Sequence, residues 1–161
     1  MPRRAGNMIQ RKKGSSHVKS EKKKTTSQRL LQIRRSGTFR EMLDTHDPTE
    51  EPSLCQYLYQ LMEEKHLSAR EMITDTGVHK SYFYAVLAGQ KTPGKNIILR
   101  FSLALHCTLN ETNRLLRLAG LSDLYPLLRR DAVLIYAVEQ KSGVQKANEL
   151  LEEAGEELLY R

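Results

Sequence analysis

Apolar residues recur three and four positions apart along most of the chain after residue 53, which is the spacing of one face of an α-helix. β-branched residues never gather in the period-two runs of a strand. The pattern predicts an all-α chain with helices at residues 54–65, 69–76, 80–88, 94–106, 109–119, 126–140 and 143–154. Because connections of only two to five residues join the middle helices, we expect neighbours to pack in a small bundle.

The apolar positions of these helices define the expected core. The side chains predicted to point inward are Leu54, Leu58, Leu61, Met62, Met72, Ile73, Phe83, Val86, Leu87, Ile97, Ile98, Phe101, Leu105, Leu115, Leu116 and Leu118. The last two helices carry further stripes, Leu127, Leu128, Val133, Leu134, Ala137 and Val138, then Val144, Ala147, Leu150 and Leu151. This C-terminal pair is expected either to cover the bundle or to form a dimer interface.

A second signal for helix starts is a Ser or Thr followed three residues later by Glu or Gln. In this pattern each side chain accepts a hydrogen bond from the other residue's backbone N–H. It occurs at Thr38 with Glu41, Ser53 with Gln56, Ser68 with Glu71, Thr108 with Glu111, and Ser142 with Gln145. Each pair lies where an amphipathic run begins, so we expect five capped helices.

The net charge of +7 is unevenly distributed. Residues 1–36 contain 12 Lys or Arg and one acid, giving +11, whereas residues 37–161 contain 14 basic and 18 acidic residues, giving −4. The first region is also poor in large apolar groups and is predicted to be a basic, largely disordered tail. A short helix and acidic linker at 37–52, a helical domain at 53–120 and the C-terminal helical pair at 121–161 are expected to follow.

Residues 68–88, SAREMITDTGVHKSYFYAVLA, predict two short helices joined by a sharp turn. Gly77 lies where a left-handed backbone conformation is expected, and Val78 follows it into the core. The second helix places three aromatic residues in succession, and rings about 100° apart cannot all face one core. Phe83 is expected to face inward, so Tyr84, one position further on, faces outward.

Here the sequence resembles the bacterial and phage regulators of the phage repressor and Cro type, often called XRE-like. The resemblance rests on LSAREMITDTGVHKSYFYAVLAGQKTP followed by IILRFSLALHCTLNETNRLLRLAGL, and it covers about residues 54–120. The turn and core positions of the motif fall on Ile73, Gly77, Val78, Phe83 and Val86, with Ile73 standing where the family usually has alanine. The resemblance implies a five-helix, phage-repressor-like helix-turn-helix bundle that binds double-stranded DNA.

The resemblance also implies that helix 80–88 enters the major groove, where base edges present distinct hydrogen-bonding patterns. The implied base-reading candidates are His79, Lys80, Ser81, Tyr84, Ala85 and Ala88. The DNA backbone candidates are Arg70, Tyr82, Lys91 and Lys95, with Tyr82 expected at the rim and His79 expected to start the helix. Residues 66–100 contain five Lys or Arg and two acids, so positive charge coincides with the motif.

The sequence offers little support for other chemistry. It contains no nucleophile elbow, phosphate-binding glycine loop or metal-ligand spacing, so no enzymatic role, cofactor or metal is predicted. Cys55 and Cys107 are expected to be free thiols. No run is long and apolar enough to span a membrane, and the basic N-terminus lacks the apolar segment of a signal peptide. A cytoplasmic protein without a membrane partner is expected.

The expected function is sequence-specific regulation of transcription, with double-stranded DNA as the partner and a homodimer as an option. Two alternatives stay open. In one, the bundle binds a protein partner, as an antitoxin or adaptor does, and DNA contact is secondary. In the other, the basic tail itself binds nucleic acid. The tail also suits a phosphate-binding arm, a solubilising extension, or a stretch upstream of a start at Met8.

Overall fold

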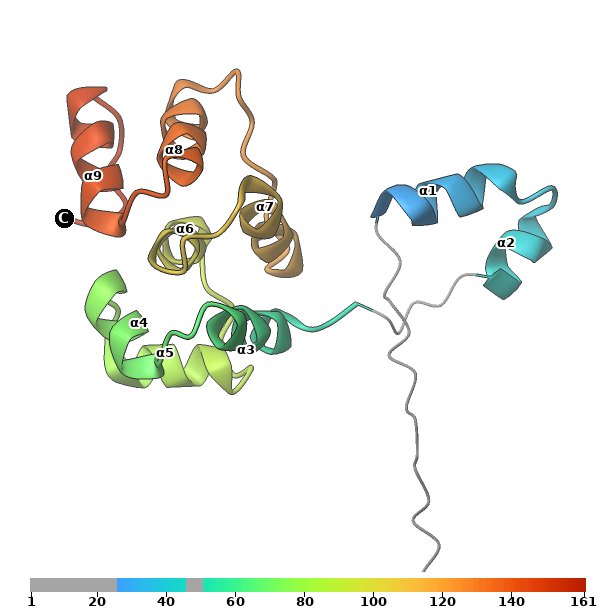
Figure 1. Cartoon of the computed structure of the whole chain (residues 1–161), viewed down its shortest axis with the longest axis horizontal. Coiled ribbons are helices and arrows are strands. Elements are labelled where there is room, and N and C mark those ends of the chain that lie inside the picture. The colour runs from blue at the N-terminus through green and yellow to red at the C-terminus, as the bar shows by residue number, and fades with distance from the viewer. Residues whose placement is uncertain (1–25, 46–50) are drawn as a thin grey trace, which may run out of the picture. The chain divides into compact units, whose positions relative to one another are not determined.

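The computed structural model describes residues 26–45 and 51–161, and these residues form helices and connections without a strand (Figure 1). The all-α prediction is therefore confirmed for the described part of the chain. The chain divides into two compact units, with the division between residues 50 and 51. The helices are α1 (Thr26–Arg35), α2 (Phe39–Thr45), α3 (Leu54–Glu64), α4 (Ala69–Thr76), α5 (Lys80–Leu87), α6 (Lys95–Ala104), α7 (Leu109–Leu118), α8 (Arg129–Glu139) and α9 (Val144–Glu153).

The first unit contains α1 and α2. Residues 26–35, which the sequence places within the basic tail, are helical, and residues 1–25 lie outside the described chain. The Gln32 side-chain amide donates to the Thr45 carbonyl at 3.1 Å and joins the two helices. Their larger apolar side chains are mostly exposed within this unit: Leu30, Leu31, Ile33, Phe39 and Leu43.

Three of the five predicted capping boxes are complete, those of Ser53, Ser68 and Thr108. Thr38 makes half of one, because its hydroxyl accepts from the Glu41 N–H while the Glu41 carboxylate accepts from the preceding residue, Gly37. The prediction at Ser142 is wrong. The extended residue before α9 is Gly143, which has no side chain to cap the helix, so Ser142 stands one position too early.

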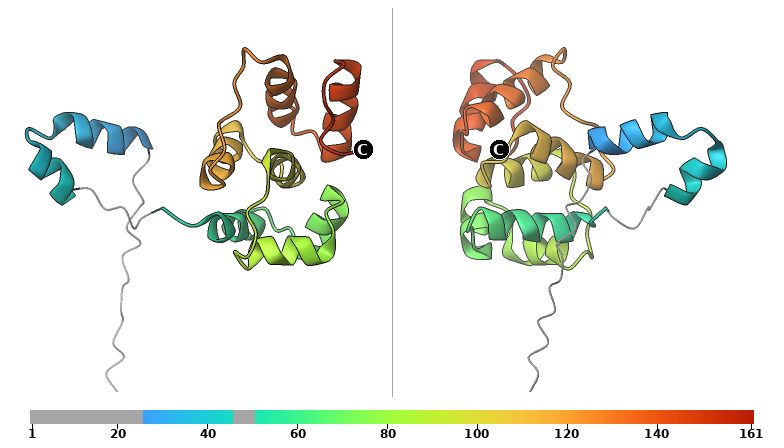
Figure 2. Two further views of the ribbon diagram at one scale, coloured as in Figure 1. Left: turned by 180° about the vertical axis from the view of Figure 1, so that it is seen from behind. Right: turned by 45° about the vertical axis from the view of Figure 1, so that its right-hand side comes forward.

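The second unit is organised around α6. Every residue from Ile98 to Leu105 is buried, so this helix meets neighbours on all sides. In Figures 1 and 2, α6 lies between the group α3 to α5 and the pair α8 and α9, and α7 packs beside it. Leu134, Ala137 and Leu151 from the C-terminal pair are fully buried in the same core. The pair therefore covers one side of the bundle.

The start of α8 differs from the prediction. The helix begins at Arg129 and not at residue 126, and Leu127 and Leu128 are 79% and 56% exposed, so their assignment to the inward stripe is wrong. The reason is Asp131, which is buried in the first turn of the helix. Its carboxylate accepts from the Tyr125 N–H at 3.0 Å, which holds the preceding chain in a turn outside the helix.

The hairpin α8–α9 repeats the hairpin α6–α7 at a spacing of 35 residues. Asn113 of α7 accepts a hydrogen bond from the N–H of Leu124, and Asn148 of α9 accepts one from the N–H of Leu159. Both leucines are buried, and both hairpins turn through a residue with positive φ, His106 or Lys141. The C-terminal pair is thus a second copy of one structural unit, which the periodicity of the sequence did not reveal.

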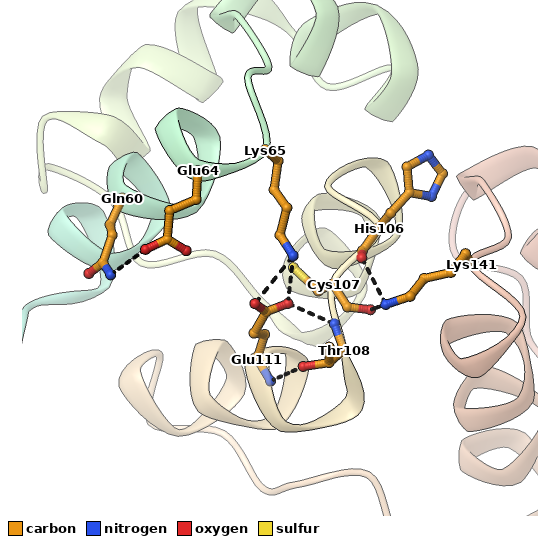
Figure 3. Close-up of polar contacts among 8 residues, drawn as sticks. All are labelled: Gln60, Glu64, Lys65, His106, Cys107, Thr108, Glu111 and Lys141. Atoms are coloured by element: carbon orange, nitrogen blue, oxygen red, sulfur yellow. Dashed lines mark hydrogen bonds and ion pairs between the residues drawn. The ribbon is translucent and has the colours of Figure 1, made fainter. Parts of the chain in front are cut away.

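Two lysines bind the connection between α6 and α7 (Figure 3). The Lys65 ammonium at the end of α3 pairs with the Glu111 carboxylate at 3.1 Å. The Lys141 ammonium donates to the carbonyls of His106 and Cys107, both at 3.1 Å. These contacts fix the α6–α7 turn to the helices on either side. Burial raises the pKa of the Cys107 thiol to about 12, so this free cysteine stays protonated.

We predict that Glu111 contributes to stability in a pH-dependent way. Burial raises the pKa of this carboxyl, but the Thr108 N–H and the Lys65 ammonium outweigh burial and hold it below its ordinary value of 4.5. Because the unfolded chain then binds the proton more readily, this stabilisation is present above the ordinary pKa and is lost as the pH falls through the folded-state pKa.

The test is urea denaturation of wild type and Glu111→Gln from about pH 6 to about pH 3. The variant is expected to start with a smaller free energy of unfolding and to lose less of it on acidification. Glu64→Gln is the matched control, because its carboxylate accepts a hydrogen bond from the exposed Gln60 amide on the same helix. Equal losses in Glu111→Gln and wild type would contradict the prediction.

Candidate nucleic-acid interface

The helices α4 and α5 are joined by residues 77–79. Gly77 has φ +62° and ends α4, donating its N–H to the Ile73 carbonyl at 3.0 Å. Val78 is buried and turns the chain into the core, as predicted, while Ile73 is half-buried against the core. A left-handed residue followed by a buried one fixes the direction in which α5 leaves the turn.

Arg100 of α6 holds this turn from the inside. Its guanidinium is buried, and both Nε, at 2.7 Å, and Nη2 donate to the carbonyl of Thr76, the last residue of α4. A Cβ atom at Gly77 would lie 3.3 Å from Nη2. Two constraints therefore favour glycine at this position: the positive φ of the backbone and the lack of space for a Cβ beside Arg100. Burial lowers the pKa of Arg100, but arginine stays charged at neutral pH.

Sequence reasoning did not single out Arg100. The available signal was one arginine within the apolar run IILRFSLAL of a helix predicted to be buried. A buried guanidinium needs hydrogen-bond acceptors, so such a residue indicates a structural contact somewhere in the fold. The acceptor itself, a carbonyl 24 residues earlier, has no mark in the sequence.

The three aromatic residues of α5 point in three directions. Phe83 is fully buried, and its ring meets the ring of Phe101 edge-on with centroids 5.6 Å apart. Tyr84 is 46% exposed, as predicted for the outward face. Tyr82 is half-buried at the rim, and the Lys91 ammonium lies 5.3 Å from its ring centroid. The inward assignment of Val86 is also confirmed.

The remaining residues predicted to read bases lie at or near the surface of α5. Lys80, Ser81 and Ala88 are exposed, and Ala85 is half-buried. His79 starts the helix, as expected, because its Nδ1 accepts from the Ser81 N–H at 3.3 Å. The same ring nitrogen lies 2.8 Å from the Ser81 hydroxyl. His79 and Ser81 are therefore engaged with each other, whereas Lys80 and Tyr84 offer their polar atoms outward.

The predicted backbone-contacting residues divide into two groups. Arg70 and Lys91 are exposed. The ammonium of Lys95, in contrast, pairs with both oxygens of the buried Asp131 at 3.1 Å. Its charge is already balanced, and its contact links α6 to α8. Lys95 therefore has less to offer a phosphate than the sequence suggested.

Two polar features belong to the helices around this surface. α6 begins after Gly94, and no side chain caps its first N–H groups. Glu71 lies near the start of α4, but its carboxylate accepts from the Ser68 hydroxyl at 2.6 Å and from the Ser68 N–H at 2.8 Å. The bonds from the Ser68 side chain and backbone lower the pKa of Glu71 and tie its charge to the helix start.

Among the described residues, no three or more His, Cys, Asp or Glu side chains are grouped so as to hold a metal ion. No helix of the described chain is long and apolar enough to cross a bilayer. Comparison with protein-family models, curated proteins and solved structures finds no match to this chain. The geometry of α4, the turn and α5 is thus the basis for a functional proposal.

We predict that Gly77→Ala destabilises the protein more than Gly120→Ala. Both glycines have positive φ, +62° and +72°, and a non-glycine residue there costs about 1–2 kcal/mol. A Cβ at Gly120 meets nothing within 4 Å, whereas one at Gly77 presses on Arg100. The difference between the two free energies of unfolding, measured in urea, reports the Arg100 contact alone. Equal values would show that this contact is not tight.

Proposed function

We propose that the chain is a sequence-specific double-stranded DNA-binding regulator of transcription in which α5 enters the major groove. The observation that carries the proposal is the presentation of α5. Phe83 and Val86 anchor one face of this helix in the core, and Lys80 and Tyr84 lie outward on the other. An α-helix fits the major groove, and side chains presented in this way reach base edges.

Each part of the surface has a role in the proposal. Lys80 donates to guanine O6 or N7, and the Tyr84 ring contacts a thymine methyl or its hydroxyl a phosphate. Ala88, which is exposed and small, allows close approach of the helix. Arg70, Lys91 and the uncapped N–H groups at the start of α6 bind phosphates and set the register.

We expect Tyr84→Ala and Lys80→Ala each to weaken specific binding by about 1–3 kcal/mol while the fold is retained. The site to be used is obtained by in vitro selection from random duplex DNA with the full chain. Tyr59→Ala on α3 is the matched control, because Tyr59 is exposed to a similar extent as Tyr84 but lies outside the proposed surface. Thermal unfolding of each variant shows whether folding is affected.

Unchanged affinity in both variants would contradict the assignment of α5. Selection with the chain lacking residues 1–25 separates this proposal from binding by the tail, because a motif that depends on α5 is enriched with or without those residues. If the folded full chain enriches no motif, the protein-partner alternative is favoured over DNA recognition.

We further propose that the regulator binds as a pair through a shallow groove between α8 and α9. The groove has a volume of about 500 Å³ and is lined by Arg129, Ala132, Val133, Tyr136, Leu150, Glu153 and Ala154. The internal repeat supports this role. Phe101 and Leu115, the equivalents of Tyr136 and Leu150 at the 35-residue spacing, are fully buried, and Phe101 packs on Phe83 of α5.

In the second hairpin the equivalent face is open to solvent, and Tyr136 is 56% exposed. A second copy of the chain suits this groove because Arg129 and Glu153 both line it, and a two-fold axis between two copies sets Arg129 of one copy against Glu153 of the other; within one chain Arg129 lies 3.8 Å from Glu156. A dimer with two-fold symmetry also matches the inverted-repeat DNA sites that dimeric helix-turn-helix proteins recognise. A heterologous protein partner seated in the same groove is the second candidate, of the adaptor or antitoxin kind.

We predict that Tyr136→Glu prevents pairing without unfolding the chain, because it places a charge in the centre of an apolar contact. Analytical ultracentrifugation of wild type is expected to show a dimer and that of the variant a monomer. Tyr125→Glu is the control, since Tyr125 has similar exposure and does not line the groove. A monomeric wild type at all concentrations would favour the heterologous partner.

A further inference from the structure

The last residues of the chain return from α9 towards the turn between α4 and α5. Asn148 of α9 holds this segment on both sides of residue 159. Its Oδ1 accepts from the Leu159 N–H at 2.7 Å, and its Nδ2 donates to the Tyr160 carbonyl at 2.9 Å. Leu159 is buried in the core, so the segment has a fixed position although it is not helical. In Figure 1 the C-terminal end lies between α9 and α4.

The fixed segment places the Tyr160 ring over Arg100. The guanidinium carbon lies 5.0 Å from the ring centroid, within the range of a cation–π interaction. Arg100 is only 8% exposed and Tyr160 is 37% exposed, so the contact is partly removed from water, which strengthens such an interaction. The Arg100 guanidinium therefore makes two contacts. It lies over the Tyr160 ring, and its Nε and Nη2 groups donate to the Thr76 carbonyl.

The Thr76 carbonyl is the point at which α4 ends and the chain turns into α5. The Thr76 hydroxyl donates to the Met72 carbonyl at 2.6 Å and accepts from the Val78 N–H at 3.4 Å, so this residue is tied to both sides of the turn. A shift of Arg100 would release an acceptor that no helical N–H satisfies. The position of the Tyr160 ring is thereby connected, through one side chain, to the direction of α5.

The first hairpin supplies an internal comparison. Tyr125, 35 residues before Tyr160, also follows a buried leucine held by an asparagine. Tyr125 is exposed and, among the contacts of the described chain, has no cation over its ring. The Tyr160–Arg100 contact is therefore not a requirement of the hairpin fold itself.

We propose that Tyr160 and Arg100 are positioning residues for α5, and that the C-terminal segment sets the orientation of this helix through the Thr76 carbonyl. Only the expected effect on DNA binding rests on the proposed function. Its structural part, the coupling of Tyr160 to the turn, holds for any role of the surface of α5.

The first test is amide hydrogen exchange of the full chain, resolved at Gly77 and Val78. We expect Tyr160→Ala to accelerate exchange at these amides about three- to thirtyfold, which corresponds to losing a partly to fully desolvated cation–π contact. Tyr160→Phe keeps the ring and is expected to exchange as wild type does. Tyr125→Ala is the matched control and is expected to leave the turn unchanged.

Two results would overturn the proposal. One is unchanged exchange at the turn in Tyr160→Ala. The other is equal acceleration at all amides of residues 51–161, which would mean that Tyr160 contributes general stability and does not position α5. Wild-type exchange in Tyr160→Phe with accelerated exchange in Tyr160→Ala supports the ring as the acting group.

The second test measures binding to the selected DNA site and to random duplex. Tyr160→Ala is expected to weaken binding to the selected site by a similar factor and to leave random-duplex binding unchanged, because sequence-independent phosphate contacts tolerate a small change in the orientation of α5 and base contacts do not. Equal loss on both DNAs would overturn the positioning role. If wild type has no selected site, the proposed function fails while the exchange result still decides the coupling.

Discussion

The burial of α6 on every side is the constraint on which the rest of the domain depends. Eight consecutive residues, 98–105, are removed from water, so α6 needs partners around its whole circumference. The group α3 to α5 and α7 supply some of them, and the C-terminal pair supplies the remainder. The two polar residues in this stretch, Arg100 and Ser102, are accepted because each has a backbone carbonyl to bind, that of Thr76 for Arg100 and that of Ile98 for Ser102. The buried helix thus determines both where the core lies and where the turn before α5 is held.

Local signals in the sequence were sufficient for the existence of helices α3 to α7. Capping at Ser53, Ser68 and Thr108 and the apolar spacing that follows involve residues within one turn of each other, so they are readable without the fold. The same rule failed at Ser142, because a pattern of residue types does not say which position has extended backbone, and Gly143 has it. At α8 the local signal was overridden by Asp131, whose bond to Tyr125 delays the helix.

Part of the candidate surface was also predictable, because it follows from relations between residues within one helix. The outward direction of Tyr84 follows from helix geometry once Phe83 faces inward, and both were predicted correctly. Contacts between distant segments were not predictable. The pairing of Lys95 with Asp131 spans 36 residues, and that of Arg100 with the Thr76 carbonyl spans 24, and neither leaves a pattern in the sequence. Such contacts decide which charged residues are available to a partner.

The duplicated hairpin gives the two proposals a common physical basis. In α6–α7 the equivalent face is buried, with Phe101 against Phe83 of α5, whereas in α8–α9 it is an open groove. α9 contributes Leu150 and Glu153 to that groove, and from the same helix Asn148 holds the segment that carries Tyr160. A partner in the groove and the orientation of α5 therefore act on one helix of about three turns. If the chain is the paired regulator proposed above, this arrangement makes the orientation of α5 on DNA depend on the contact between the two copies.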